Sequence, residues 1–197
     1  MGKKIAITGG IGSGKSTVSN ILKDKGYPVY SCDEIYAELV NSKIYIDEIK
    51  EVFPTAVKQG KIDKKCLAEI IFSDKQKRTR LNKIAHPLIM QTLLARMNEN
   101  DSQIVFAEVP LLLEGNFENL FDKTIVVLRS REERIRSICT RDGIPPEKAE
   151  ERLNAQFDYD AIESKNRLQK LGAIFIENIG DVSALKNSVN VTLKNLT

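Results

Sequence analysis

The chain has 197 residues, 42% hydrophobic and 29% charged, which is typical of a soluble globular protein with one sizeable α/β domain. Its formal net charge of +3 does not favour a nucleic-acid-binding function, and no apolar run approaches the length that spans a bilayer. Three widely spaced cysteines without a C-x-x-C pair indicate neither a disulfide framework nor a zinc site. We therefore expect a reduced, cytoplasmic protein without nucleic-acid or membrane partners, and we favour a monomer.

Short apolar segments alternate with helical patterns along most of the chain. A first strand is expected over 4–8 and is followed by a helix over 16–25. A short second strand is expected to begin at Val29. Three further strands are expected over 103–109, 123–128 and 173–176. Because strands separated by helices form parallel sheets covered on both faces, the predicted fold class is α/β, with three layers and five parallel strands.

The interval between the second and third strands shows helical periodicity instead of a strand pattern. Apolar residues recur at helical spacing over 46–53, 67–71 and 88–97. The segment Gln59-Gly60-Lys61 predicts a turn, and His86-Pro87 is expected to start a new helix with Pro near its first position. We therefore predict one domain over 1–197 with a helical subdomain inserted at 32–102.

A second helical region is expected after the fourth strand. The segment Ser130-Arg131-Glu132-Glu133 has the pattern of a capping box, which marks the start of a helix. The run Asp142-Gly143-Ile144-Pro145-Pro146 predicts the end of that helix and the start of another. We assign 130–160 to a lid region.

The most informative motif lies between the first strand and its helix, where residues 9–16 fit G-x-x-x-x-G-K-[ST]. Glycines let the backbone wrap closely around a phosphate, and the loop amides and the helix N-terminus present positive charge to it. Lys15 adds a full charge, and Ser16 offers a hydroxyl to Mg²⁺. The alternative is an ordinary Gly-rich turn, which the motif and its context together disfavour. The predicted nucleotide-binding residues are contiguous: Thr8, Gly9, Gly10, Ile11, Gly12, Ser13, Gly14, Lys15, Ser16 and Thr17.

Asp33 follows the second strand, at the edge of a parallel sheet where ligands bind. Its carboxylate could accept a proton from a substrate hydroxyl. However, Ser31-Cys32-Asp33-Glu34 is also a capping box, and an acid in the first turn of a helix complements the helix dipole. The position of Asp33 supports both interpretations equally.

Arginines gather on the first helix of the lid region. Arg134, Ser137 and Arg141 lie at i, i+3 and i+7 and therefore share one face of that helix. Clustered guanidinium groups suit the spread negative charge of a phosphoryl group in transfer. A solvated basic face is the alternative, and the P-loop in the same chain favours the phosphate interpretation.

Three further polar residues are open to two interpretations. His86, the only histidine, is either a locally bonded helix-start residue or a substrate contact. Glu108 ends the third strand, where many P-loop proteins place an Asp for Mg²⁺, and Glu114 follows in the adjoining loop. Either carboxylate could hold a metal-bound water or face solvent.

Several segments together resemble the dephospho-CoA kinase family over nearly the whole length. They comprise the P-loop, Asp33-Glu34-Ile35, Lys61-Ile62-Asp63, Ile71-Phe72, Leu81-Asn82-Lys83-Ile84-Ala85-His86-Pro87, Val109-Pro110-Leu111-Leu112-Leu113-Glu114, Arg141-Asp142-Gly143, Arg152-Leu153-Asn154-Ala155-Gln156 and Ile176-Glu177-Asn178-Ile179-Gly180. The His-Pro and Pro-Leu-Leu-x-Glu segments distinguish this family from other P-loop kinases.

The resemblance implies a P-loop NTPase fold like that of nucleoside-monophosphate kinases, and an ATP- and Mg²⁺-dependent reaction. The γ-phosphate of ATP would pass to the ribose 3′-hydroxyl of dephospho-CoA, giving coenzyme A and ADP in the last step of coenzyme A biosynthesis. Asp33 matches the family's catalytic base, Arg141 matches a lid arginine on the ATP phosphates, and His86 matches a residue near the CoA substrate.

The chain also departs from the family pattern. The family has a second lid arginine one turn before Arg141, where this chain has Ser137, and Arg134 could compensate from the same helix face. Another small-molecule kinase is the first alternative function. A GTP-dependent switch is the second, and it is disfavoured because the sequence contains no D-x-x-G and its one Asn-Lys is followed by Ile-Ala.

Overall fold

The structure, a computed structural model, describes residues 2–72 and 74–196, so Met1 and Thr197, the ends of the predicted domain, lie outside the described residues. The chain divides into two compact units. The first, the sheet unit, comprises the described residues of 1–30 and 100–197, and the second, the helical unit, is Ser31–Glu99. The predicted insertion at 32–102 covers nearly the same stretch as the helical unit, and its role in substrate binding stays a prediction.

The sheet unit is built on five strands in the order β2-β5-β1-β6-β7. Their bounds are β1 (Lys3–Thr8), β2 (Val29–Ser31), β5 (Ile104–Glu108), β6 (Lys123–Leu128) and β7 (Ile174–Glu177). The central strand β1 pairs in parallel with β5 and β6, with Ile7 opposite Glu108 and Thr8 opposite Val126. The predicted α/β fold with a five-stranded parallel sheet is confirmed, and the central strand leads directly into the P-loop.

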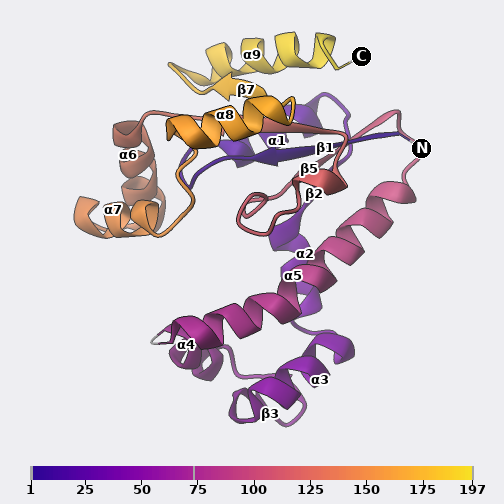
Figure 1. The fold of residues 1–197 in the computed structure, drawn as a ribbon, viewed down its shortest axis with the longest axis vertical. Helices are drawn as coiled ribbons and strands as arrows, with labels where there is room; N and C mark the ends of the chain where they lie inside the picture. The colour runs from indigo at the N-terminus through magenta and orange to yellow at the C-terminus, as the bar shows by residue number, and fades with distance from the viewer. Residues whose placement is uncertain (1, 73, 197) are drawn as a thin grey trace. The chain divides into compact units, whose positions relative to one another are not determined.

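Helices cover both faces of the sheet (Figure 1). The helices α1 (Lys15–Asp24) and α9 (Val182–Lys194) pack on one face, where Ile5 and Ile7 of β1 belong to the same core as Val18 and Leu185. On the other face, Leu168 of α8 (Ile162–Lys170) shares a core with Val126 of β6, and the short helix η2 (Glu118–Leu120) precedes β6. Adjacent residues of each strand therefore face opposite layers, as strand geometry requires.

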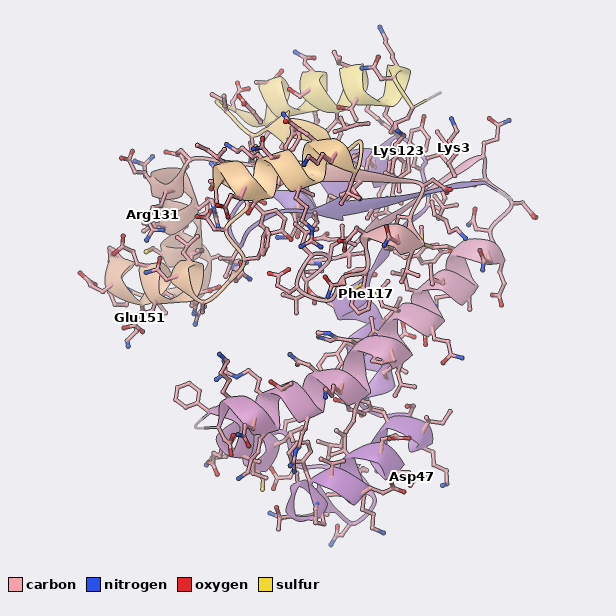
Figure 2. All side chains as sticks on the ribbon, in the orientation of Figure 1. Lys3, Asp47, Phe117, Lys123, Arg131 and Glu151 are labelled. Atoms are coloured by element: carbon pink, nitrogen blue, oxygen red, sulfur yellow. The ribbon has the colours of Figure 1, made fainter. Side chains whose placement is uncertain are left out.

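The lid region of the sheet unit contains α6 (Arg131–Asp142) and α7 (Pro146–Asn154), which Figure 2 shows carrying Arg131 and Glu151. Ser130 Oγ accepts a hydrogen bond from Glu133 N at the start of α6, as the capping pattern predicts. Gly143 ends the helix in the left-handed conformation, with φ of 65°. Ile138, Ala149 and Leu153 are buried in a core that joins the two helices.

The helical unit is folded around its own core. Its helices are α2 (Cys32–Leu39), α3 (Lys43–Val52), η1 (Pro54–Ala56), α4 (Lys64–Phe72) and α5 (Lys75–Asn98). Tyr45 and Ile49 of α3 are fully buried, and they share this core with Leu81 and Ala85 of α5. None of the helices in the described part of the chain is long and apolar enough to span a bilayer.

Two expectations for this unit were wrong. The structure contains two short antiparallel strands, β3 (Val57–Lys58) and β4 (Lys61–Ile62), where we expected none. They flank the predicted turn, in which Gln59 and Gly60 both have positive φ, as in the type I′ turns of tight hairpins. Strands of two residues carry too little alternation to be recognised in a sequence.

The second wrong expectation concerns His86-Pro87, which does not start a helix. Pro87 lies inside α5, which runs without interruption from Lys75 to Asn98 and changes direction partway along (Figure 1). A proline removes one backbone hydrogen bond and crowds the preceding turn, so it bends a helix more readily than it ends one when both halves are packed. Both halves of α5 are packed, since Leu81 and Ala85 precede Pro87 and Met90 and Leu93 follow it, all buried.

Candidate phosphate-binding site

The P-loop joins β1 to α1 at the carboxyl edge of the sheet. Thr8 is the last residue of β1, residues 9–14 form the loop, and Lys15 opens α1. Two glycines are required by close backbone contacts. A Cβ on Gly9, at φ of 140°, would lie 2.3 Å from Val127 O, and a Cβ on Gly12, at φ of 76°, would lie 2.8 Å from Arg134 O. The loop is therefore held tightly between β6 and α6.

The ammonium group of Lys15 folds back over the loop. Its Nζ donates hydrogen bonds to Gly9 O at 3.0 Å and to Gly10 O at 3.1 Å. Both acceptors are neutral carbonyl groups, which hold a cation less strongly than phosphate oxygens do. The arrangement keeps the Lys15 charge over the loop, where an incoming phosphate would meet it.

The hydroxyl of Ser16 lies against a buried carboxylate. Ser16 Oγ donates to Glu108 Oε1 and Ser19 Oγ donates to Glu108 Oε2, each at 2.8 Å. Glu108 is only 8% exposed and lies at the end of β5, next to β1. Glu114, the other carboxylate considered, instead accepts a hydrogen bond from the backbone amide of Phe157.

The oxygen atoms around Ser16 suit a hard divalent cation. A hydroxyl and a carboxylate are the donor types that Mg²⁺ takes from proteins, alongside waters and substrate phosphates. The contact between Ser16 and Glu108 brings these two donor types together at the N-terminus of α1. The residues present therefore fit Mg²⁺.

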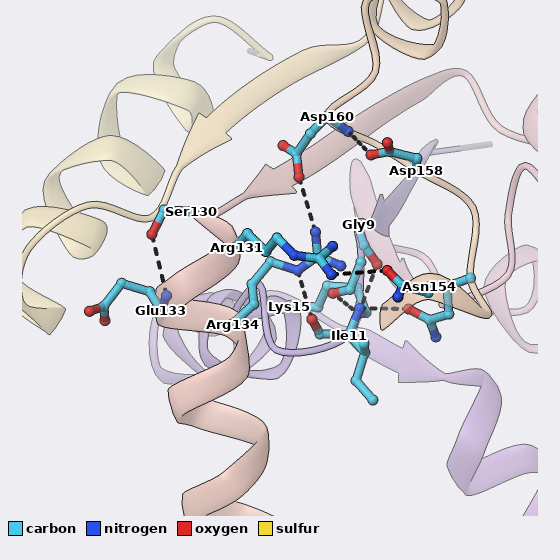
Figure 3. Close-up of polar contacts among 12 residues, drawn as sticks. Gly9, Ile11, Lys15, Ser130, Arg131, Glu133, Arg134, Asn154, Asp158 and Asp160 are labelled. Atoms are coloured by element: carbon cyan, nitrogen blue, oxygen red, sulfur yellow. Dashed lines mark hydrogen bonds and ion pairs between the residues drawn. The ribbon is translucent and has the colours of Figure 1, made fainter. Parts of the chain in front are cut away.

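Arg134 is built into the wall of the phosphate site and is only 6% exposed. Its Nε donates to Ile11 O at 2.9 Å, and its Nη1 forms an ion pair with Asp160 Oδ2 at 3.0 Å (Figure 3). The guanidinium also covers Gly10, since a Cβ there would lie 2.1 Å from Arg134 Nη2. Burial lowers the pKa of Arg134, while Asp160 and Asp158 oppose that shift. The guanidinium stays charged at neutral pH, as arginine does in proteins.

The other lid positions lie elsewhere on α6. Ser137, which stands where the family has a second lid arginine, accepts a hydrogen bond at its Oγ from Arg129 Nη1 at 2.7 Å. Arg141 is 60% exposed and forms a paired hydrogen bond with its neighbour Asp142, which also pairs with Arg152. The bond to Asp142 raises the pKa of Arg141.

Two predicted site residues belong to the helical unit. Asp33 is exposed in the first turn of α2, where Ser31 Oγ caps the helix by accepting a bond from Glu34 N. His86 is half-buried in α5, and burial lowers its pKa. Both roles of Asp33, cap-region acid and catalytic base, are compatible with this position.

Sequence reasoning did not single out three polar side chains that contact the loop. Asn178 Nδ2 donates to Ser13 O at 2.9 Å, Gln156 Oε1 accepts from Ile11 N at 2.8 Å, and the Tyr159 hydroxyl lies 2.9 Å from Thr8 Oγ1. Asn178 and Gln156 lie in segments quoted for the family resemblance, which was the available signal. Tyr159 had none, because its contact depends on tertiary packing alone.

Comparison with known proteins identifies the family. The family model described as dephospho-CoA kinase matches residues 3–182. A dephospho-CoA kinase of Thermus thermophilus is 35% identical over 193 residues, covering 98% of this chain and 91% of that protein.

Solved structures agree with that match. A crystal structure of a Thermus thermophilus protein superposes with a TM-score of 0.82 at 33% identity, covering 100% of this chain and 98% of the other. Dephospho-CoA kinase from Campylobacter jejuni gives a TM-score of 0.71 at 26% identity, covering 100% and 98%. With the P-loop fully formed and the match extending over nearly the whole length, the chain belongs to the dephospho-CoA kinase family.

Proposed function

We propose that this chain transfers the γ-phosphate of ATP to the ribose 3′-hydroxyl of dephospho-CoA, giving coenzyme A and ADP. This is the last step of coenzyme A biosynthesis. The observation that carries the proposal is the family match over residues 3–182. The match includes the P-loop and the lid segments, and also the His-Pro and Pro-Leu-Leu-x-Glu segments, which distinguish this family from other P-loop kinases.

The P-loop amides and Lys15 would hold the ATP phosphates. The N-terminus of α1, which opens at Lys15, adds its partial positive charge. Lys15 would exchange its bonds to the carbonyls of Gly9 and Gly10 for stronger ones to phosphate oxygens. Because phosphoryl transfer depends mainly on positioning and charge stabilisation, these contacts account for much of the expected catalysis.

Ser16 and Glu108 would hold Mg²⁺, Ser16 through its hydroxyl and Glu108 directly or through a bound water. Mg²⁺, when bound, neutralises charge on the phosphates. Glu108 keeps the Ser16 hydroxyl oriented, because the two side chains already share a hydrogen bond. Ser19 fixes the second carboxylate oxygen and so limits rotation of the Glu108 side chain.

The acceptor would be served by residues of the helical unit. We assign Asp33 as the base that takes the proton of the ribose hydroxyl, and His86 as a contact to the CoA substrate. The support for both is their match to family positions, together with the exposure of Asp33 and the partial exposure of His86. A neutral His86 follows from its lowered pKa, so it would act at neutral pH through hydrogen bonding or packing and not through charge.

The lid arginines would complete the site. Arg141 is assigned to the ATP phosphates through its match to the family's lid position, and its exposure leaves the guanidinium accessible to a ligand. Arg134 is assigned to the same phosphates because its guanidinium covers Gly10 of the loop. We further place the protein in the cytoplasm as a monomer, without nucleic-acid or membrane partners.

The direct test is to incubate the protein with dephospho-CoA, ATP and Mg²⁺ and to measure the formation of coenzyme A by mass spectrometry. We expect product only when all three are present. A Lys15→Ala enzyme should lose at least about a hundredfold in turnover, the usual cost of removing one strong charge-stabilising donor, while remaining folded. A folded wild-type protein that makes no coenzyme A would contradict the proposal.

A panel of other hydroxyl acceptors separates this function from that of another small-molecule kinase. Nucleosides, nucleoside monophosphates and shikimate should each support much slower ATP consumption than dephospho-CoA. Faster ATP consumption with any of these acceptors would leave the P-loop as the ATP site but would assign that acceptor, in place of dephospho-CoA, as the substrate.

A further inference from the structure

The backbone amide of Ile11 lies in the middle of the P-loop and is already hydrogen-bonded. It donates to the side-chain oxygen Oε1 of Gln156 at 2.8 Å, across 145 positions of sequence. Amides of this loop are the groups that bind nucleotide phosphates in P-loop proteins. A side chain from the end of the lid region therefore holds a donor that phosphate binding would use.

The segment that carries Gln156 is anchored to the loop at two further points. We refer to residues 156–160 as the clamp segment. The hydroxyl of Tyr159 is buried against Thr8 Oγ1 at 2.9 Å, and Asp160 pairs with Arg134, whose Nε reaches Ile11 O (Figure 3). Ile11 is thus held at its amide by Gln156 and at its carbonyl by Arg134. These contacts of Tyr159 and Asp160 do not involve the Gln156 side chain, so they would keep the clamp segment in place if Gln156 moved.

Gln156 has space to leave the amide. A cavity of about 300 Å³ lies beside it, and its lining includes the polar residues Arg131, Asn154 and Asp158 as well as Gln156 itself. A glutamine side chain has three rotatable bonds, and its carboxamide could find new partners among those groups without movement of the backbone. Release of the amide therefore does not require the lid to unfold.

We propose that the Gln156 carboxamide oxygen competes with nucleotide phosphate for the Ile11 amide, so that Gln156 sets the affinity of the P-loop for ATP. A neutral carboxamide oxygen keeps the partly buried amide satisfied in the empty enzyme. It then yields to phosphate, because hydrogen bonds to charged acceptors are roughly twice as strong as neutral ones. The inference rests on the proposed function only in requiring that the P-loop bind ATP.

The test is nucleotide affinity in a Gln156→Met variant, which keeps the length of the side chain and removes the competing oxygen. We expect the Kd for ATP, measured by titration calorimetry, to fall by about threefold to tenfold, the value of one neutral hydrogen bond. Gln169→Ala, which removes an exposed glutamine on α8, should leave the Kd unchanged. Gln156→Glu should weaken ATP binding, because a carboxylate holds the amide more strongly and repels phosphate.

The amide itself provides a second readout that does not depend on activity. In ¹⁵N–¹H spectra of the empty enzyme, the Ile11 resonance should shift in Gln156→Met, and ATP should then move it to the same position in both proteins. Unchanged or weaker ATP binding by folded Gln156→Met would overturn the proposal and make Gln156 a packing residue or a nucleotide ligand. Failure of the wild-type protein to bind ATP would instead contradict the proposed function.

Discussion

Arg134 donates a hydrogen bond from Nε to the carbonyl oxygen of Ile11, and this contact joins the first helix of the lid to the phosphate-binding loop. The carbonyl that Arg134 holds belongs to the residue whose amide is held by Gln156. A change at Arg134 therefore alters the support of the loop as well as the charge around it.

Replacing Arg134 should impair nucleotide binding more than folding. In Arg134→Ala, Ile11 loses a carbonyl partner and the phosphate site loses one positive charge, so we expect weaker ATP binding and lower turnover. Asp160, the ion-pair partner, is 41% exposed and can be hydrated, so no unpaired charge is left buried when the pair is lost. Calorimetry with ATP and thermal melts of the empty enzyme separate the two effects.

Arg136 is the matched control on the same helix, because it is 74% exposed and its ion pair is with Glu133. Arg136→Ala should behave like the wild type in both measurements. If Arg134 also covers for the arginine absent at position 137, adding Ser137→Arg should restore turnover to Arg134→Ala. Equal kinetics for the two alanine variants, or no restoration, would reject the compensation by Arg134.

Loss of Arg141 should affect turnover without affecting stability. The guanidinium is mostly exposed and its bonds are to Asp142, so its removal costs the fold little. If it stabilises charge on the transferring phosphoryl group, Arg141→Ala should lower kcat by at least about a hundredfold. Steady-state kinetics at saturating substrates test this, and a normal kcat would assign Arg141 to the surface of the lid.

Asp33→Asn distinguishes the two interpretations of that carboxylate. As a general base, Asp33 should contribute about 10²-fold or somewhat more to the chemical step, since a loose phosphoryl-transfer transition state asks little of a base. ATP binding should be unchanged. A variant with normal single-turnover rates and a lower melting temperature would leave Asp33 as a helix-terminus residue only.

Neutralising Glu108 should raise the Mg²⁺ requirement. Glu108→Gln preserves shape and can still bond Ser16 and Ser19, but it removes the buried negative charge beside them. Residues that orient metal ligands typically contribute 10- to 100-fold to metal affinity. The Mg²⁺ concentration that gives half-maximal turnover should therefore rise by at least about tenfold. Glu114→Gln is the control, and an identical shift there would remove the special role of Glu108.

The stability of the protein should decrease on mild acidification because of His86. Burial lowers the pKa of His86 in the folded protein, so below about pH 6.5 the unfolded chain binds a proton more readily than the folded one. The free energy of unfolding therefore rises with pH across this interval and falls as the pH drops. The free energy of unfolding can be measured by urea titration at several pH values. It should change less with pH in His86→Gln than in the wild type, and an unchanged pH dependence would attribute the effect to other groups.

Most of the sheet could be predicted because its signals are local. The strand over 123–128 coincides with β6, and the strand expected to begin at Val29 does so. The predicted strands over 4–8, 103–109 and 173–176 differ from the observed ones by one residue at one or both ends. The P-loop is equally local, since its glycines, Lys15 and Ser16 are adjacent in sequence. The ends of strands are harder to predict because residues there are half-exposed, so their types fit a strand and a loop equally well.

The long-range parts of the site could not be predicted in the same way. The contact of Gln156 with Ile11 and that of Tyr159 with Thr8 each join residues about 150 positions apart, and no pattern in either segment refers to the other. The continuity of α5 through Pro87 was missed for a related reason. Packing on both sides of the proline keeps the helix intact, and that packing exists only after folding.

The position of the helical unit within the chain affects how the sheet can assemble. The strands β2 and β5 are neighbours in the sheet, and Phe106 N donates to Pro28 O beside them, yet the whole stretch 32–103 separates them in sequence. Closing so long a loop is entropically expensive until the intervening chain is compact. Because that chain has its own buried core, its local helices can form first and shorten the effective loop. Both β1 and β2 reach β5 only across this stretch, so we expect the rate at which they pair with β5 to depend on residues that the sheet does not contain.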